Sequence, residues 1–296
     1  MPRHKILIIA NRRSGTGSTV DLKTLATRIF RELHAEYTLE YTRAPGHATE
    51  LAYDGMRNGC TAIVAAGGDG TVNEVARAVV GSDTPMGIIP RGSGNGLARH
   101  LGIPLDPERA LASIVQATPI PIDTFTLNER LSLNVSGIGF DGHVAAVFNE
   151  SKRRGLFNYA RIAITEYRKF VPFHATVQAE STPPELRDIF FVAIANSSQY
   201  GNNARIAPDA SVRDGKLTIN AVTRIPLHRL DAVWSLFRGD VTRKSWCTTF
   251  EVANIILHTD RKVAYHVDGE PCGVDDTFVV RVRPASLRMI IPDEGV

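Results

Sequence analysis

Three short stretches rich in glycine carry the residues of this chain that could do chemistry. They read NRRSGTG from residue 11, GGDGTVN from residue 67 and RGSGNG from residue 91. Glycine has no Cβ, so the backbone N–H groups of such loops can approach a phosphate closely. A helix that starts after Gly70 would add a partial positive charge, and Thr71 to Glu74 match a capping box that would fix its start. The pattern therefore predicts a phosphate-binding cradle, with ordinary strand-to-helix turns as the alternative.

A single acid, Asp69, lies among the glycines of the second stretch. A carboxylate there would repel a phosphate unless a cation lay between them, which favours Mg²⁺ carried by nucleotide phosphates. The alternatives for Asp69 are a partner of a helix dipole or a turn-forming residue. We expect glycine at Gly68 because a side chain would fill the phosphate's path, or because the backbone has a positive φ. The spacing matches neither the dinucleotide fingerprint nor a P-loop, because no Gly-Lys-Ser/Thr follows.

The elements that must position these loops alternate over the first third of the chain. Short apolar runs predict strands at 5–10, 37–42, 61–66 and 86–90, and helical patterns lie near 18–34, 47–58, 71–80 and 106–117. Alternation of this kind indicates a parallel sheet covered on both faces. Ligands of such sheets bind beyond the carboxyl ends of the strands, so the three loops should meet at one edge.

The pattern changes after the proline-rich stretch at 119–121. Strand-like runs dominate from there, with helices predicted only at about 142–170 and 227–237. We therefore predict two domains, an α/β domain over 1–122 and a mainly β domain over 123–284.

Composition excludes several classes of protein. The net charge is only +3 over 296 residues and neither half is strongly basic, so nucleic acid binding has no support. The three cysteines, Cys60, Cys247 and Cys272, form no metal or disulfide pattern and suit a cytoplasmic protein. We expect no transmembrane segment, because the apolar run at the N-terminus has five residues.

The motifs together resemble the diacylglycerol kinase catalytic-domain family, which includes bacterial lipid kinases and sphingoid-base kinases. The resemblance rests on GGDGTVNEV, IIPRGSGNGLARHLGIP, GIGFDGHV, IAPDASVRDGKL and HVDGE, which occur in that order. It implies a Rossmann-like α/β domain and a C-terminal β-sandwich with a nucleotide cleft between them. It also implies that the segment 285–296 returns to the first domain.

The resemblance assigns residues to three roles. A proton acceptor is implied at Glu270, or at Asp69 as proposed for sphingoid-base kinases. A structural Mg²⁺ site is implied at Asp214, with main-chain carbonyls of Ser211 and Lys216. The ATP contacts it implies are Asn11, Arg12, Arg13, Ser14, Gly15, Thr42, Gly67, Gly68, Asp69, Gly70, Thr71, Val72, Asn73 and Ser93.

The implied activity is an ATP- and Mg²⁺-dependent lipid kinase that transfers the γ-phosphoryl group to a lipid hydroxyl, most simply of diacylglycerol. Asn95-Gly96 resembles sphingoid and ceramide kinases instead, and this leaves the acceptor open. The sequence is also compatible with an NAD kinase and with a regulator that binds nucleotide without turnover. The enzyme would be cytoplasmic, meet its lipid at the membrane surface, and could form a homodimer.

Several residues also have plainer interpretations. Asp268-Gly269 is a strong type I′ turn signal, so Glu270 could belong to a solvated hairpin. Asp141 could line the cleft or cap the helix that begins near Gly142. The stretches at 151–170 and 227–239 combine basic and aromatic residues and could lie on a membrane, although packing against the β domain is the commoner explanation.

Overall fold

The computed structural model describes residues 5–12, 14, 21–151, 156–179, 186–226 and 230–292, and gives no side chains for 156, 157 and 230–233. The chain divides into two compact units. Unit 1 consists of Met1–Ile122 and Ala285–Val296, and unit 2 of Asp123–Pro284. In the described ranges, no helix is long and apolar enough to span a bilayer.

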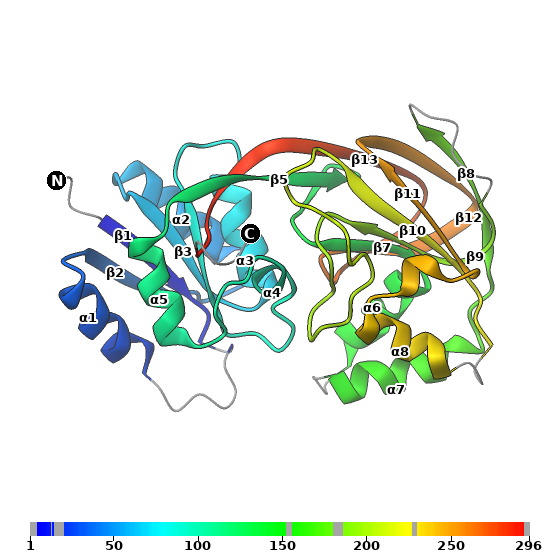
Figure 1. Cartoon of the computed structure of the whole chain (residues 1–296), viewed down its shortest axis with the longest axis horizontal. Helices are drawn as coiled ribbons and strands as arrows, with labels where there is room; N and C mark the ends of the chain where they lie inside the picture. Colours follow the sequence, from blue (N-terminus) through cyan, green and yellow to red (C-terminus); the bar gives the residue numbers. More distant parts are fainter. Residues whose placement is uncertain are drawn as a thin grey trace. The chain divides into compact units, whose positions relative to one another are not determined.

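Unit 1 is built on a parallel sheet (Figure 1). Its strand order is β13-β4-β3-β1-β2, and the last residues of β13 join it through the pair Met289 and Met86. The strands that lie wholly in this unit are β1 (Lys5–Ala10), β2 (Glu36–Tyr41), β3 (Ala62–Gly67) and β4 (Met86–Pro90). Because β3 and β4 are buried throughout, they are continuous apolar runs in the sequence.

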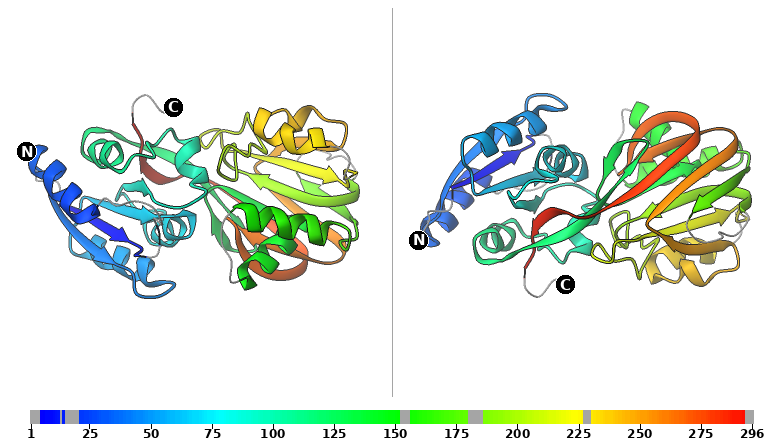
Figure 2. Two further views of the ribbon diagram at one scale, coloured as in Figure 1. Left: turned by 90° about the horizontal axis from the view of Figure 1, so that it is seen from below. Right: turned by 90° about the horizontal axis from the view of Figure 1, so that it is seen from above.

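Helices cover both faces of this sheet (Figures 1 and 2). They are α1 (Leu22–Glu32), α2 (His47–Arg57), α3 (Asp69–Val79), α4 (Gly96–His100) and α5 (Pro107–Gln116). On one face, apolar residues of α1 and α5 share a buried cluster with Ile6, Ile8 and Val64. On the other face, α2 approaches so closely that a Cβ on Gly55 would lie 2.5 Å from Leu7 Cδ2 and 2.8 Å from Ile63 Cδ1. Successive side chains of β1 and β3 point to opposite faces of the sheet, so the same two strands pack against the helices on both sides.

Unit 2 is mainly antiparallel β structure. Its strands are β5 (Pro119–Leu127), which begins in unit 1, β6 (Arg130–Ser132), β7 (Val135–Gly139), β8 (Phe173–Ala179), β9 (Leu186–Ala195), β10 (Leu217–Thr223), β11 (Cys247–Val252), β12 (Asn254–Val267) and β13 (Glu270–Ile290). The long strands β9 and β12 each pair with β7 along one part and with β8 along another. The four strands therefore close into a ring around a core that includes Phe125, Phe173 and Phe278.

The described residues of unit 2 also form the helices α6 (Phe140–Glu150), α7 (Leu156–Tyr167) and α8 (Leu230–Arg238) and the 3₁₀ turn η1 (Val241–Arg243). The helical stretch predicted over 142–170 is thus two helices, with 152–155 outside the described residues. The strand β13 starts in unit 2 and ends in unit 1, where it appears in red in Figure 2.

The predicted capping box is wrong. Helix α3 begins at Asp69 with Gly68 as its N-cap, so Thr71 already lies in the first turn. The carboxylate of Glu74 instead accepts a hydrogen bond from the backbone N–H of Ala48 at 3.2 Å, and Thr49 Oγ1 donates to the Glu74 carbonyl at 2.7 Å. Glu74 therefore fastens α2 to α3 rather than closing the start of α3.

Candidate functional site

The three glycine-rich loops follow three neighbouring parallel strands of unit 1. Because β1, β3 and β4 lie side by side, the loops after them emerge at the same edge of the sheet. The first two strand ends are joined by Asn11 N–H, which donates to the Ala66 carbonyl at 3.1 Å. The last two are joined by Arg91 N–H, which donates to the Gly67 carbonyl at 2.8 Å. The convergence expected from the sequence is present in the described parts of these loops.

The second and third loops touch backbone to backbone. A Cβ built on Gly92 would lie 2.5 Å from the Cα of Gly68, and one built on Gly68 would lie 3.2 Å from the Cα of Gly92. Gly68 has a φ of −89°, so the expectation of a positive φ at this position is wrong. Glycine is required at Gly92 because a Cβ would collide with the Gly68 backbone, and the same approach leaves little room for a side chain at Gly68, in addition to any approach by a phosphate.

The carboxylate of Asp69 holds the third loop in place. Its Oδ2 accepts the backbone N–H of Asn95 at 3.1 Å and its Oδ1 accepts that of Gly96 at 3.0 Å. Asn95 has a left-handed backbone, with φ of 51°, and its side-chain amide exchanges two 2.9 Å hydrogen bonds with the backbone of Gly92. Asp69 therefore caps the start of α4, 27 residues further along the chain. This geometry gives Asp69 a structural task, and its part in metal binding or proton transfer stays a prediction.

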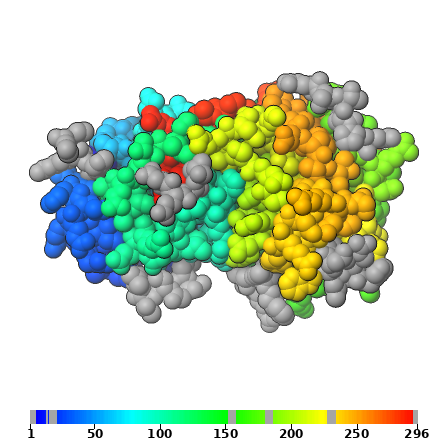
Figure 3. All heavy atoms as spheres, in the orientation of Figure 1, coloured from blue at the N-terminus to red at the C-terminus, as the bar shows by residue number. Residues whose placement is uncertain are grey.

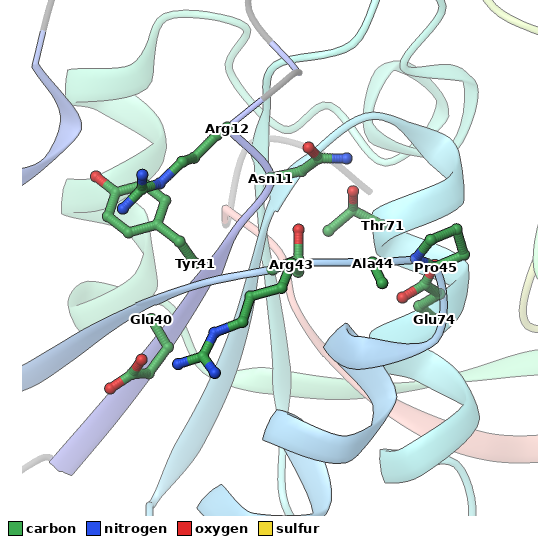
Figure 4. Close-up of a pocket in the computed structure, with 10 residues that line it drawn as sticks. Asn11, Arg12, Glu40, Tyr41, Arg43, Ala44, Pro45, Thr71 and Glu74 are labelled. Atoms are coloured by element: carbon green, nitrogen blue, oxygen red, sulfur yellow. The ribbon is translucent and has the colours of Figure 1, made fainter.

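A pocket of about 710 Å³ opens beside the first two loops, entirely within unit 1 (Figure 4). The guanidinium carbon of Arg12 lies over the ring of Tyr41, 4.6 Å from its centre, and the two side chains are stacked at the edge of the pocket. Its other walls are the segment from Glu40 to Pro45 and the α3 residues Thr71 and Glu74. A cavity of this size, with an aromatic wall and polar groups, suits a small molecule such as a nucleotide.

The residues expected to contact nucleotide differ in how accessible they are. Asn11, Arg12, Thr42 and Thr71 line the pocket. Gly67, Val72 and Asn73 are buried, so they can offer a ligand little beyond backbone groups, whereas Ser93 is exposed at the tip of the third loop. Ser14, Gly68 and Gly70 are half-buried, and Arg13 and Gly15 lie outside the described residues.

Glu270 stands at the start of β13, on a tight hairpin in unit 2. Asp268 and Gly269 have φ of 48° and 85°, as the predicted type I′ turn requires, and Glu270 pairs with Val267 across it. Asp268 is not a solvated turn residue: its carboxylate accepts from Ser132 Oγ at 2.6 Å and from the backbone N–H of Leu133 and Asn134 at 2.9 and 3.0 Å. Glu270 itself is exposed, so it is accessible to a substrate.

A buried polar network supports the same hairpin from the other side. The backbone N–H of Gly269 donates to Nδ1 of His266 at 3.0 Å, so the imidazole proton belongs on Nε2, which lies 3.0 Å from Asp141 Oδ2. Tyr200 and Tyr159 also donate to Asp141, at 2.7 and 3.2 Å. The cap predicted at Asp141 is wrong, since α6 has no side-chain cap. Its carboxylate, 12% exposed, is held in this network instead, and a place in a nucleotide cleft stays a prediction.

The ionisation of Asp141 follows from these contacts. Burial alone would raise the pKa of Asp141, but the close contact with His266 and the hydrogen bonds from its Nε2–H and from the two tyrosine hydroxyls hold that pKa below its ordinary value. Burial and the nearby carboxylate raise the pKa of both Tyr159 and Tyr200 well above 10. The network is thus a buried anion with three donors, a stable arrangement only while every donor remains in place.

Asp214 forms a turn at the edge of unit 2. Its Oδ1 accepts the backbone N–H of Lys216 at 3.0 Å, and the N–H of Gly215 donates to the carboxylate of Asp123 at 2.8 Å. Ser211 Oγ accepts the N–H of Arg213 at 3.2 Å. No group of three His, Cys, Asp or Glu side chains gathers into a metal cage among the described residues. A cation at Asp214 would therefore depend on main-chain carbonyls, as the resemblance implies.

Comparison with known families decides the identity of this fold. Residues 5–127 match the diacylglycerol kinase catalytic domain, and residues 134–291 match the YegS C-terminal NAD kinase beta sandwich-like domain. The chain belongs to the diacylglycerol kinase catalytic-domain family of lipid kinases. The Rossmann-like unit followed by a sandwich-like unit, expected from the sequence, is the arrangement of this family.

Individual members of the lipid kinase family align over nearly the whole chain. A protein of Pseudomonas aeruginosa (strain UCBPP-PA14) named probable lipid kinase YegS-like is 28% identical, covering 99% of this chain and 96% of its own length. One of the same name from Klebsiella pneumoniae (strain 342) is 26% identical, covering 97% and 96%. The crystal structure of a diacylglycerol kinase from Bacillus anthracis str. Sterne superposes with a TM-score of 0.74 at 20% identity, covering both chains completely. That last likeness concerns the fold.

Two sets of contacts in this member of the family could not be predicted from the sequence. The hydrogen bonds from the backbone N–H groups of Asn95 and Gly96 to Asp69 could not be read from a short stretch of sequence, because the donors lie 26 and 27 residues after Asp69. The partners of Asp141 were also missed, although His266 lies within the HVDGE motif. No pattern in the sequence shows that the turn makes His266 a buried acceptor for the Gly269 N–H.

Proposed function

We propose that this protein is an ATP-dependent lipid kinase that transfers the γ-phosphoryl group to a hydroxyl of a diacylglycerol-type lipid. The observation that carries the proposal is the junction of two glycine-rich loops, at Gly68 and Gly92, beside the start of α3. Backbone N–H groups at a helix start are suited to phosphate oxygens, and phosphoryl transfer depends mainly on positioning and charge stabilisation.

The nucleotide is proposed to use the pocket in unit 1. Its volume of about 710 Å³ and the stacked pair of Arg12 and Tyr41 are suited to an aromatic base and its sugar. Asn11 and Thr71 line the same pocket and offer polar groups toward the glycine-rich loops. This arrangement supports binding of a nucleoside triphosphate, with the phosphates directed along the edge of the sheet.

Glu270 is proposed as the general base that accepts the proton of the acceptor hydroxyl. It is exposed, and the hairpin that carries it is anchored through Asp268 and His266. A base held on a rigid turn loses little conformational freedom when it meets a substrate. Asp69 is a weaker candidate, because both of its oxygens already accept backbone N–H groups.

Magnesium is proposed to enter with the nucleotide. Mg²⁺ in kinases is held mainly by substrate phosphates, waters and one or two carboxylates, so the absence of a three-ligand cage among the described residues fits this mode. When bound, the ion would neutralise phosphate charge during transfer. A second, structural ion is proposed at Asp214 with the carbonyls of Ser211 and Lys216. If the melting temperature depends on Mg²⁺ in the same way in Asp214→Ala and in the unmutated protein, the proposal of a second ion is refuted.

One assay tests the proposed activity directly. Labelled ATP is offered with diacylglycerol, sphingosine, ceramide, phosphatidylglycerol or NAD, in detergent micelles for the lipids. Phosphorylation of diacylglycerol above the others is expected, whereas preference for sphingosine or ceramide would follow the Asn95-Gly96 resemblance to those kinases. Efficient formation of NADP would refute the lipid acceptor, and ATP binding without turnover on any acceptor would refute catalysis.

A further inference from the structure

Helix α8 presents two large aromatic side chains to solvent. Trp234 is 61% exposed and Phe237 is 46% exposed, and their spacing of three residues puts them on one face of the helix. The helix has a packed side as well, because Ser235 is 2% exposed and Leu236 packs against a buried cluster that includes Val241. The explanation favoured from the sequence, packing against the β domain, therefore holds for one face of α8 and fails for Trp234 and Phe237.

Basic residues lie near the C-terminal end of the same helix. Arg238 directly follows Phe237 and is exposed. Arg205, also exposed, lies beside the end of α8, where its backbone N–H donates to the Leu236 carbonyl at 2.8 Å. Arg243 is exposed in η1. The nearby acid Asp240 is paired with Lys244 at 2.7 Å and also interacts with the charge of Arg238, but the three arginines and Lys244 outnumber it. We call Trp234, Phe237, Arg205, Arg238 and Arg243 the α8 patch.

The golden-yellow segment that includes α8 and η1 is uncovered on the face shown in Figure 3. An exposed tryptophan and phenylalanine beside arginines are the residues that favour the boundary between lipid headgroups and acyl chains. Arginine also binds phosphate oxygens through several donors, and anionic lipids attract such clusters electrostatically.

We propose that the α8 patch docks this protein on a bilayer that contains anionic phospholipid. The two rings would enter the headgroup region and the arginines would contact lipid phosphates. The proposal rests on the proposed function, in which the acceptor is a membrane lipid. A shallow surface contact is also the kind of attachment that the described residues offer, because none of their helices could cross a bilayer.

The size of the patch argues against a second protein as its occupant. A tryptophan or phenylalanine side chain that a partner covers completely buries a surface area on the order of 150–250 Å². Stable protein interfaces bury roughly 800 Å² of surface on each partner. The two rings of the α8 patch, which are already partly buried, offer much less apolar area than such an interface needs. A lipid surface needs no such complementary area, because insertion of a few side chains and electrostatic attraction act together.

Vesicle binding of the full chain tests the proposal without any need for turnover. Co-sedimentation is measured with vesicles of phosphatidylcholine alone and with phosphatidylglycerol added. The unmutated protein should bind the anionic vesicles more tightly. Trp234→Ala/Phe237→Ala should weaken that binding by about ten-fold or more, and Arg238→Glu/Arg243→Glu by at least about five-fold for each charge. The matched controls are Val274→Ala, which removes an apolar side chain 61% exposed on β13, and Arg57→Glu on α2.

The outcomes separate this proposal from the proposed function. Phosphorylation of a short-chain, water-soluble diacylglycerol should be the same in the α8 variants and the unmutated protein, since no membrane is involved. Equal vesicle binding by all proteins, or none by the unmutated one, overturns the docking proposal even if kinase activity is present. A dimer that dissociates in Trp234→Ala/Phe237→Ala would assign the face to a second copy and also overturn it.

Discussion

Replacing Asp69 with asparagine tests whether this carboxylate serves structure or chemistry. In the native protein its two oxygens accept the N–H groups of Asn95 and Gly96 at 3.1 and 3.0 Å. An asparagine keeps one acceptor oxygen and turns an NH₂ group toward the other N–H, so one hydrogen bond is lost and two donors face each other. A charge-assisted hydrogen bond contributes about 1.5–3 kcal/mol. Because Asp69 is half-buried, we expect a loss near 2 kcal/mol, the lower part of that range.

Thermal unfolding and nucleotide titration measure this effect. A loss of about 2 kcal/mol corresponds to a fall of roughly 4–8 °C in melting temperature for a domain of this size. ATP affinity should fall as well, because the loop that ends at Gly96 is no longer fastened beside Gly68. The matched control is Asp83→Asn, on an exposed turn of the same unit, which should change stability by less than about 0.5 kcal/mol.

The opposite pattern would refute the structural role of Asp69. If Asp69→Asn melts like the unmutated protein, binds ATP equally well, and loses only kcat with an altered dependence on Mg²⁺, the carboxylate acts on the metal or the hydroxyl. The hydrogen bonds to Asn95 and Gly96 would then be incidental to its function.

The other predictions concern a base, a glycine and a histidine. Glu270→Gln keeps the shape of the side chain but removes the base, so steady-state kinetics should show kcat lower by a factor of about 10² or more with ATP affinity nearly unchanged; normal turnover would exclude Glu270 as the base. Gly137→Ala would place a Cβ 2.6 Å from His266 Nε2 and against Asp141. The free energy of unfolding, measured by chemical denaturation, should therefore fall by about 3–5 kcal/mol. The fall should be smaller when the same change is made in the Asp141→Ala variant. Burial lowers the pKa of His100 from 6.5 to about 4, so the unfolded chain binds a proton first as the pH falls. Stability should therefore decline from about pH 6.5 towards pH 4, by up to roughly 3 kcal/mol, and a pH series of melting curves should show a flatter decline for His100→Gln.

The elements of unit 1 could be predicted because burial and sequence pattern coincide there. Residues 62–66 and 86–90 are buried on both faces, so they appear as apolar runs. Gly67 directly follows the first run, and Gly92 follows the second after Arg91. The convergence of the three loops followed from the rule that parallel strands end at one edge. The start of α3 was predicted wrongly, because the capping-box pattern at Thr71 is local whereas Glu74 is engaged by α2.

The roles of single carboxylates were less accessible from sequence. Asp69, Asp141 and Asp268 each stand beside a glycine, which suggested turns, caps or ligand sites. Their carboxylate oxygens instead accept hydrogen bonds from groups remote in the chain, such as Asn95 for Asp69 and Tyr200 for Asp141. Hydrogen bonds of this kind depend on how strands are arranged, and a short window of sequence contains no information about that arrangement.

The path of β13 has a consequence for how the protein is made. The strand that lies beside β4 in unit 1 comes from residues after Pro284, which a ribosome adds only when all of unit 2 has been synthesised. Until then β4 is an open sheet edge, with backbone groups exposed to pairing with other chains. Unit 1 should thus mature last although it is begun first. A fragment that ends at residue 122 should aggregate more readily than the same fragment linked to residues 285–296.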